Sequence, residues 1–165
     1  GVQLRNLATV GGSIYSRFGF SDVLTMFLAL NASVELYKGG VVPLAEYAQR
    51  PYDRDILVRV LVPKENARFV YQSVRNSQTD FPVLTCAAAK LADGSIRAAI
   101  GARPGKAVLY TAAPEAGEAA EEFAARFAAE VKADIKTESN LRGGAEYRRH
   151  LAGVLTKRAV CRLEG

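Results

Sequence analysis

Residue types that support many common chemistries are scarce in this sequence. Its 165 residues include one histidine, two cysteines and no tryptophan. A single histidine excludes a Ser-His-Asp triad with a spare base and a multi-histidine metal site, and His150 lies in a helical pattern where a surface or structural role is expected. Cys86 and Cys161 lack the paired spacing of zinc or iron–sulfur ligands, and they indicate a reducing, cytoplasmic environment.

Long apolar runs and a strong net charge are missing too. The longest lipophilic stretch, residues 23–30, is interrupted by Thr25 and is far too short to span a membrane. The net charge is +5, from 22 basic and 17 acidic residues that are scattered along the chain. One alternative function is a small nucleic-acid binder, which would have a basic stripe interleaved with aromatics and would bind with a steep dependence on salt. The scattered charge argues against this alternative.

The composition that remains is that of a soluble globular protein. Apolar residues make up 49% and charged residues 24% of the chain, which suits one large domain or two small ones. The chain opens with Gly1 directly in a segment that carries chemistry, so we expect a piece of a longer protein. One local group of cations is interpreted as a solvated helix face: Arg148, Arg149, Lys157, Arg158 and Arg162.

The order of patterns predicts an α+β fold. In residues 1–62, Ser21 and Asp22 are good helix-start residues for an apolar-periodic helix that runs to Asn31. A strand is then expected over residues 32–37, a turn over 38–40 and a returning strand that begins at 41–42. A short helix over 43–50 and a strand over 55–62 follow.

Residues 63–165 have a different pattern and are predicted to form a second domain. Four strands with a tight Asp93-Gly94 turn indicate an antiparallel meander over residues 67–75, 83–91, 95–100 and 107–111. Two amphipathic helices follow. The first has the stripe Phe123, Phe127 and Val131, and the second spans about 146–162 with the stripe Tyr147, Leu151, Val154, Leu155 and Ala159.

The segment Thr9-Val10-Gly11-Gly12-Ser13 has the clearest chemical meaning. It presents backbone N–H groups and two hydroxyls at one point, which suits a phosphate or pyrophosphate. Paired glycines permit a positive φ and a close approach of the backbone to a ligand. The alternative is a tight structural turn that Ser13 caps.

The motif Arg5-Asn6-x-Ala8-Thr9-x-Gly11-Gly12-x-Ile14, followed by Ser21-Asp22, resembles the second FAD-binding motif of the molybdenum-hydroxylase flavoproteins. These are the flavin subunits or domains of xanthine dehydrogenase and carbon monoxide dehydrogenase. Residues 12–22 look closest to the separate flavin subunit of bacterial xanthine dehydrogenases. The resemblance continues in the family's order through Leu28-x-Leu30-x-Ala32, Asp55–Val58, Tyr71-Gln72, Arg75, Thr79–Pro82, Gly101–Pro104, Tyr147–Ala152 and Lys157–Ala159.

The resemblance implies the second subdomain of a vanillyl-alcohol-oxidase-type FAD-binding domain, followed by an antiparallel sheet with two C-terminal helices. The first glycine-rich phosphate loop belongs to an N-terminal subdomain that precedes residue 1. The implied contacts are Thr9, Gly11, Gly12 and Ser13 to the diphosphate, Ser16 and Asp22 to the ribityl or nucleotide part, Leu57 to the isoalloxazine ring and Tyr71 near its edge. Some relatives have lysine in place of Tyr71.

The resemblance also implies a function, an electron-transfer component of an oxidoreductase. Electrons would pass from iron–sulfur clusters on one partner subunit through FAD to NAD, while hydroxylation takes place at a molybdenum cofactor on another subunit. The implied partners are therefore these two subunits, the N-terminal half of the flavin subunit and NAD. No residue of this chain is assigned a catalytic or metal-binding role. The alternative is a subunit-docking or assembly module that holds no flavin.

Overall fold

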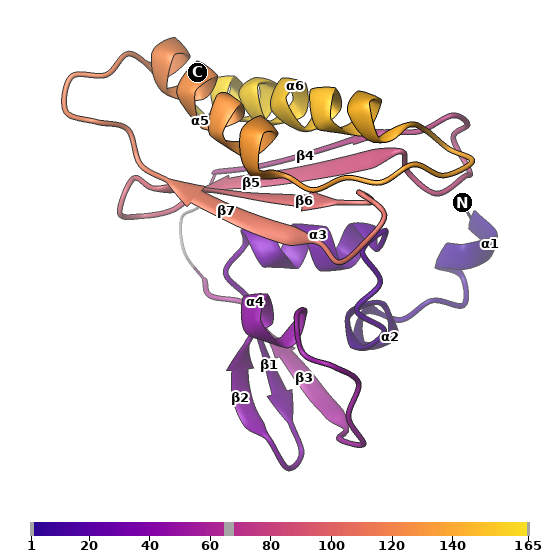
Figure 1. The fold of residues 1–165 in the computed structure, drawn as a ribbon. Coiled ribbons are helices and arrows are strands. Elements are labelled where there is room, and N and C mark those ends of the chain that lie inside the picture. Colours follow the sequence, from indigo (N-terminus) through magenta and orange to yellow (C-terminus); the bar gives the residue numbers. More distant parts are fainter. Residues whose placement is uncertain (1, 65–67, 165) are drawn as a thin grey trace.

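The computed structural model describes residues 2–64 and 68–164, and its first part is built around a small antiparallel sheet (Figure 1). The strands have the order β2-β1-β3. Gly40 has a positive φ of 66° in the tight turn between β1 and β2. In chain order the elements are α1 (Val2–Arg5), α2 (Val10–Tyr15), α3 (Asp22–Ala29), β1 (Ser33–Leu36), β2 (Gly40–Pro43), α4 (Leu44–Tyr47) and β3 (Leu57–Leu61).

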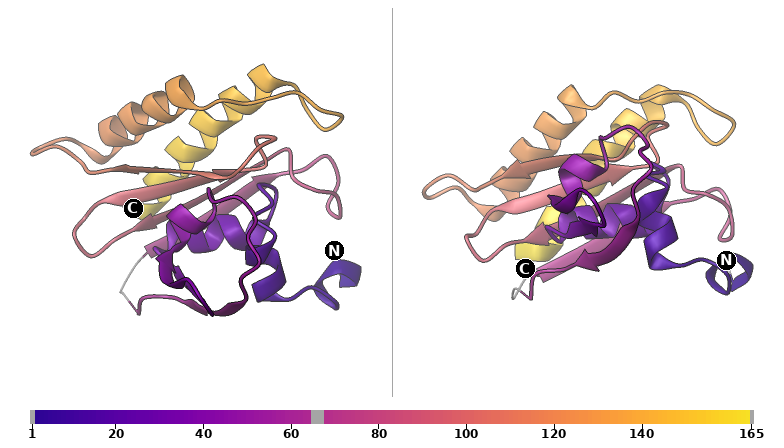
Figure 2. Two further views of the ribbon diagram at one scale, coloured as in Figure 1. Left: turned by 60° about the horizontal axis from the view of Figure 1, so that its bottom comes forward. Right: turned by 90° about the horizontal axis from the view of Figure 1, so that it is seen from below.

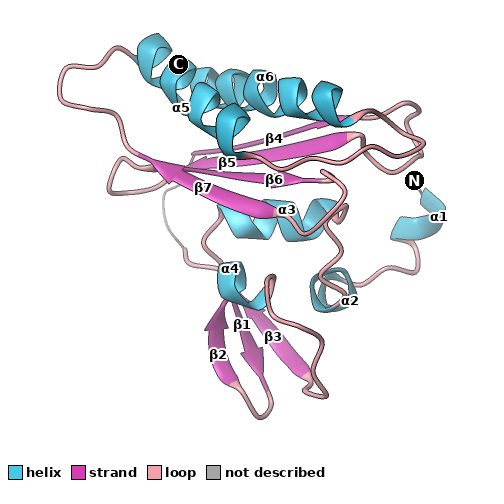
Figure 3. Cartoon of the chain, viewed as in Figure 1, coloured by secondary structure: helices cyan, strands magenta, loops and turns pink. Residues whose placement is uncertain are grey.

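The second part is a four-stranded antiparallel meander of order β4-β5-β6-β7 with two helices on one face (Figure 3). This arrangement confirms the predicted α+β class. Residue 67, the first of the predicted β4, and Gly1 lie outside the described residues. The elements are β4 (Arg68–Val74), β5 (Leu84–Lys90), β6 (Ile96–Gly101), β7 (Val108–Ala112), α5 (Ala120–Asp134) and α6 (Ala145–Glu164).

The four-stranded sheet is covered on both faces. Alternate residues of β5 point to opposite faces, so Cys86 and Ala88 join the core beneath α5 and α6, whereas Ala87 and Ala89 join the core shared with α3. Small side chains on a doubly buried strand allow helices to pack closely on each side. The predicted division at residues 62 and 63 stays a prediction, because the front part and the second sheet share this core.

Two glycines permit the close contact between the front part and the sheet. A Cβ on Gly101 would lie 2.4 Å from Thr25 Oγ1 and 2.5 Å from Thr85 Oγ1. A Cβ on Gly19 would lie 1.7 Å from the carbonyl oxygen of Gly105. The Ala102 N–H donates to the Gly19 carbonyl at 2.6 Å, so the loop before α3 is fastened to the end of β6.

The interpretation of Arg148 as part of a solvated helix face is wrong. Its side chain is fully buried and donates four hydrogen bonds, to the Val83, Glu138 and Gly143 carbonyls and to Asn140 Oδ1. Burial lowers the pKa of this guanidinium. The five N–H donors of an arginine satisfy loop carbonyls that would otherwise be unpaired, and a charge count along the sequence does not reveal such a role.

The second helix also departs from its predicted stripe. Leu151, Leu155 and Ala159 are buried as expected, but Tyr147 is half exposed. Within the described residues, no helix has the length and apolarity to cross a membrane, and no three His, Cys, Asp or Glu side chains gather as a metal site.

Candidate functional site

The Thr9–Ser13 segment is the start of a helix rather than a free turn. Thr9 is the N-cap of α2 in an extended conformation, and its Oγ1 accepts from the Gly12 N–H at 3.0 Å. Ser13 Oγ donates back to the Thr9 carbonyl at 2.9 Å. Gly11 and Gly12 do not use the positive φ that glycine permits, because both lie in α2 and neither is among the positive-φ glycines.

The two glycines of α2 differ in what surrounds them. A Cβ on Gly11 would meet nothing within 4 Å, whereas a Cβ on Gly12 would lie 3.0 Å from Thr9 Oγ1. The space where a side chain of Gly11 would begin is therefore open in the described part of the chain. A ligand oxygen has room to approach the N-terminal end of α2 at this position.

Serine hydroxyls connect α2 to α3. Ser13 contributes its carbonyl oxygen, which accepts from Ser21 Oγ at 3.1 Å and from Ser16 Oγ at 3.4 Å. The carbonyl of Ser16, in turn, accepts from the Tyr52 hydroxyl. The structure thus brings Ser13 and Ser16 next to the beginning of α3, with the Ser16 hydroxyl engaged inside the protein.

Ser21, not Asp22, caps α3. The Leu24 N–H donates to Ser21 Oγ at 3.2 Å, so the carboxylate of Asp22 is not used as a cap. It instead accepts from the Tyr71 hydroxyl at 2.7 Å and from Arg75 Nη2 at 2.6 Å. Burial and the neighbouring Asp22 raise the pKa of Tyr71, which therefore stays a neutral hydrogen-bond donor.

This cluster contains two predicted site residues, Asp22 and Tyr71, together with Arg75, which was not predicted as a site residue. Asp22 and Tyr71 are 49 residues apart in the chain, and Arg75 lies 53 residues from Asp22. The signal that could have pointed to Arg75 is its position four residues after Tyr71, because even spacing places side chains on the same side of an extended segment. Leu57 opens β3, where it is half-buried and borders the same apolar core as Tyr71.

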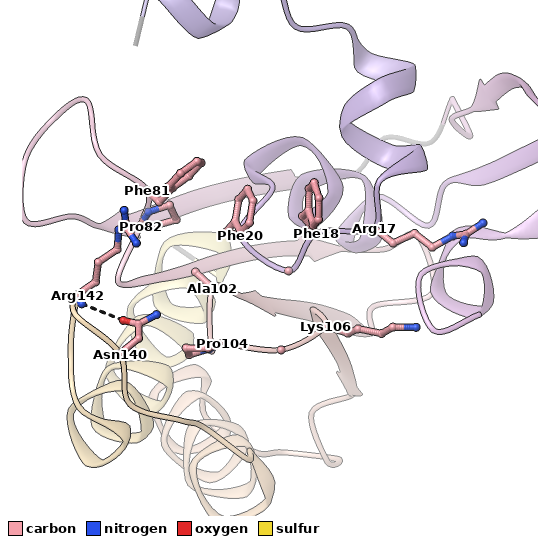
Figure 4. Close-up of a pocket in the computed structure, with 12 residues that line it drawn as sticks. Arg17, Phe18, Phe20, Phe81, Pro82, Ala102, Pro104, Lys106, Asn140 and Arg142 are labelled. Atoms are coloured by element: carbon pink, nitrogen blue, oxygen red, sulfur yellow. Dashed lines mark hydrogen bonds between the residues drawn. The ribbon is translucent and has the colours of Figure 1, made fainter. Parts of the chain in front are cut away.

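An aromatic cleft of about 500 Å³ adjoins this region (Figure 4). Phe18 and Phe20 stack with ring centroids 5.0 Å apart, and Phe20 and Phe81 are 4.5 Å apart. Arg142 lies over the Phe81 ring at 5.1 Å and forms an ion pair with Asp80 at 2.7 Å. These rings are not part of the core: Phe18 is 51% exposed. The Phe18-Gly19-Phe20 alternation directly before Ser21-Asp22 is the signal that could have revealed them.

Arg17 anchors the loop that carries these phenylalanines. Its φ of 51° is in the left-handed region, and its guanidinium lies 4.0 Å from the centre of the Tyr47 ring. Arg17 Nη1 donates to the Pro51 carbonyl at 2.9 Å, and Nη2 lies 3.7 Å from Asp53. The loop between α2 and α3 is therefore held from below by the segment that follows α4.

Comparison with known proteins accounts for nearly the whole chain. Residues 1–65 match the family described as FAD binding domain in molybdopterin dehydrogenase, and residues 69–163 match the CO dehydrogenase flavoprotein C-terminal domain. The chain is 28% identical over 156 residues to the uncharacterized protein YgfM of Escherichia coli K12, covering 93% of this chain and 57% of YgfM. It thus spans little more than half the length of this curated relative.

Solved structures agree in fold. Carbon monoxide dehydrogenase from Hydrogenophaga pseudoflava matches with a TM-score of 0.82 and 23% identity, over 99% of this chain and 63% of that one. Quinoline 2-oxidoreductase from Pseudomonas putida 86 matches with a TM-score of 0.78 and 20% identity, over 98% and 62%. With two family matches that follow one another along the sequence, the chain belongs to the FAD-binding flavoprotein family of the molybdenum hydroxylases.

Proposed function

We propose that this chain forms part of the flavin site of a cytoplasmic, xanthine-dehydrogenase-type molybdenum hydroxylase. Electrons reach FAD from iron–sulfur clusters on one partner subunit and leave to NAD, while hydroxylation occurs at a molybdenum cofactor on another. When bound, FAD supplies the redox chemistry, and the protein supplies binding and orientation. The observation that carries the proposal is that a hydrogen bond from Ser21 Oγ to the Ser13 carbonyl joins α2 to the start of α3, where Tyr71 and Arg75 hold the Asp22 carboxylate.

The residues present fit the two chemical parts of such a nucleotide. A diphosphate needs N–H donors and an uncovered backbone, which the Thr9-capped start of α2 and Gly11 provide, and the first turn of α2 has no acidic residue to repel it. Sugar hydroxyls need acceptors, and Asp22 provides a carboxylate. We assign Thr9, Gly11, Gly12 and Ser13 to the diphosphate, Ser16 and Asp22 to the sugar part, and Leu57 and Tyr71 to the side near the ring.

The aromatic cleft supports NAD as the electron acceptor. Its lining begins at Arg17, a few residues before Asp22, and its phenylalanine rings offer stacking surfaces for planar groups. Two cations also line this cleft: Arg142, which is paired with Asp80, and Lys106, whose Nζ donates to the Gln49 and Arg50 carbonyls. A nicotinamide nucleotide bound there would lie beside the site assigned to the flavin.

Exposed apolar side chains in and after α1 support the proposal that a partner segment packs against this helix. Val2, Leu4 and Leu7 are 63%, 61% and 88% exposed, and Figure 2 shows α1 projecting from the side of the molecule. Apolar residues concentrated in one projecting segment favour an interaction site. We propose that the N-terminal half of the flavin subunit covers them and supplies the first phosphate loop.

The test is to add NADH without oxygen to the purified holoprotein that contains this chain. We expect the visible flavin absorbance to bleach, and Phe20→Ala to raise the NADH concentration that is needed. Tyr147→Ala, which removes an exposed aromatic ring on α6, should change nothing. A colourless, well-folded holoprotein would favour the assembly-module alternative. A flavin that NADH does not reduce would overturn only the assignment of the acceptor.

A further inference from the structure

We propose that Arg75 and Tyr71 are positioning residues that hold the Asp22 carboxylate as an acceptor for the sugar hydroxyls of the flavin nucleotide. This inference rests on the proposed function and deepens it. The three groups converge from two separate elements, since Asp22 is the first residue of α3 whereas Tyr71 lies in β4 and Arg75 directly follows that strand. Their mutual distances are those of short, charge-assisted hydrogen bonds.

Each carboxylate oxygen of Asp22 receives one bond from the protein. Oδ1 accepts from the Tyr71 hydroxyl at 2.7 Å, and Oδ2 accepts from Arg75 Nη2 at 2.6 Å. A carboxylate has about four acceptor positions, so about two are left. The side chain of Asp22 is 39% exposed, whereas that of Arg75 is 22% exposed. The remaining acceptor positions are therefore available from the solvent side.

Arg75 is itself held in place. Its Nη1 donates to the carbonyl of Asp80 at 2.8 Å, and the Asp80 carboxylate is bound by Arg142. The guanidinium thus joins the loop after β4 to α3. If the Asp22 carboxylate rotated, its hydrogen bond to Arg75 would break, because the bond to the Asp80 carbonyl keeps the guanidinium in place. Because the planar guanidinium of Arg75 is bonded to the Asp80 carbonyl and to the Asp22 carboxylate, it fixes the orientation of that carboxylate.

The charges of the cluster select the class of ligand group. Arg75 balances Asp22, and Tyr71 is a neutral donor, so the cluster has no net positive charge that would attract a phosphate. An ionised carboxylate with free acceptor positions binds donors, and the donors of a flavin nucleotide outside its rings are the ribityl and ribose hydroxyls. The Asp22 cluster therefore favours hydroxyl groups over anionic groups.

The test is to measure FAD affinity, by quenching of flavin fluorescence, in the apo form of the holoprotein that contains this chain. Arg75→Met should weaken binding tenfold or more and Tyr71→Phe about threefold to tenfold, while Arg75→Lys recovers part of the loss. Arg126→Met is the matched control, because it breaks an ion pair of 2.9 Å between Arg126 on α5 and Glu118 in the segment before that helix. This control should leave FAD affinity unchanged.

A double-mutant cycle separates positioning from general stability. Asp22→Asn should weaken FAD binding, and adding Arg75→Met to it should cost much less than Arg75→Met alone, because Arg75 acts through Asp22. Thermal unfolding of each variant shows whether it folds, and Tyr71→Phe keeps the test valid if Arg75→Met does not. Additive losses, or unchanged affinity in folded variants, would overturn the positioning role. An unsubstituted holoprotein that binds no FAD would overturn the proposed function as well.

Discussion

At the scale of single residues, a methyl group added at Gly12 is expected to affect ligand binding more than folding. A Cβ there would lie 3.0 Å from Thr9 Oγ1, a flexible side-chain atom that can shift by a few tenths of an ångström. We predict that Gly12→Ala weakens FAD binding at least tenfold with a small change in thermal unfolding, because the added methyl group would displace Thr9 Oγ1, which we assign to the diphosphate, and would crowd the diphosphate's approach. Fluorescence titration of the apo holoprotein measures the affinity.

A matched control for this substitution is Gly153→Ala in α6. Its Cβ would lie 3.3 Å from Lys132 Cβ, a similarly crowded helix position where α5 and α6 meet. Gly153→Ala should leave FAD affinity unchanged. Native affinity in Gly12→Ala would show that the start of α2 is not the diphosphate contact.

At the scale of elements, the position of α3 depends on Gly101. Thr25 of α3 and Thr85 of β5 meet at this glycine, with their hydroxyl oxygens 3.4 Å apart. We predict that Gly101→Ala destabilises the fold by about 1–3 kcal/mol, because the added methyl group forces packed elements apart. Urea unfolding measures the loss, and Gly11→Ala, which meets open space, serves as the control. Equal stability of the two variants would contradict this account of the packing.

The start of α5 gives a prediction on pH. Arg126 and the Glu115 N–H hold the pKa of Glu118 at about 2, below the value of about 4.3 in unfolded chains. A depressed folded pKa stabilises the protein above about pH 4.3, and this contribution is lost as the pH falls toward about 2. We expect Glu118→Gln to flatten the acid side of the stability profile, measured by urea unfolding across this range. Glu121→Gln, which removes a carboxylate without an ion pair in the described residues, should leave the slope as it was.

At the scale of the whole molecule, the 165-residue chain is predicted to bind FAD weakly or not at all when alone. The start of α2 and Asp22 supply one side of the proposed site, and the chain covers 57% of YgfM and 63% of the Hydrogenophaga protein. A diphosphate held from one side lacks several charge-assisted hydrogen bonds, each worth about 1.5–3 kcal/mol. Titration of FAD into the folded chain tests this, and tight one-to-one binding without an N-terminal partner would refute it.

Local patterns were enough to predict the order of helices and strands from α3 onward, but not the short helices α1 and α2. The meander follows from alternating runs and the Asp93-Gly94 turn, and α5 follows from the spacing of Phe123, Phe127 and Val131, all of which are buried. The motif around Thr9 was found from sequence because its residues are contiguous. Its conformation was not, because one hydrogen bond from the Gly12 N–H to the Thr9 side chain caps a helix in place of the expected turn.

The sequence by itself therefore determined the α+β class, the meander and the position of the Thr9–Ser13 motif. Only the tertiary structure decided that Arg148 is buried, that phenylalanines line an open cleft, and that Asp22 meets Tyr71 and Arg75. The physical reason is distance along the chain. Periodicity reports which face of an element is apolar, but partners 49 and 53 residues apart are chosen by how α3 packs on the sheet.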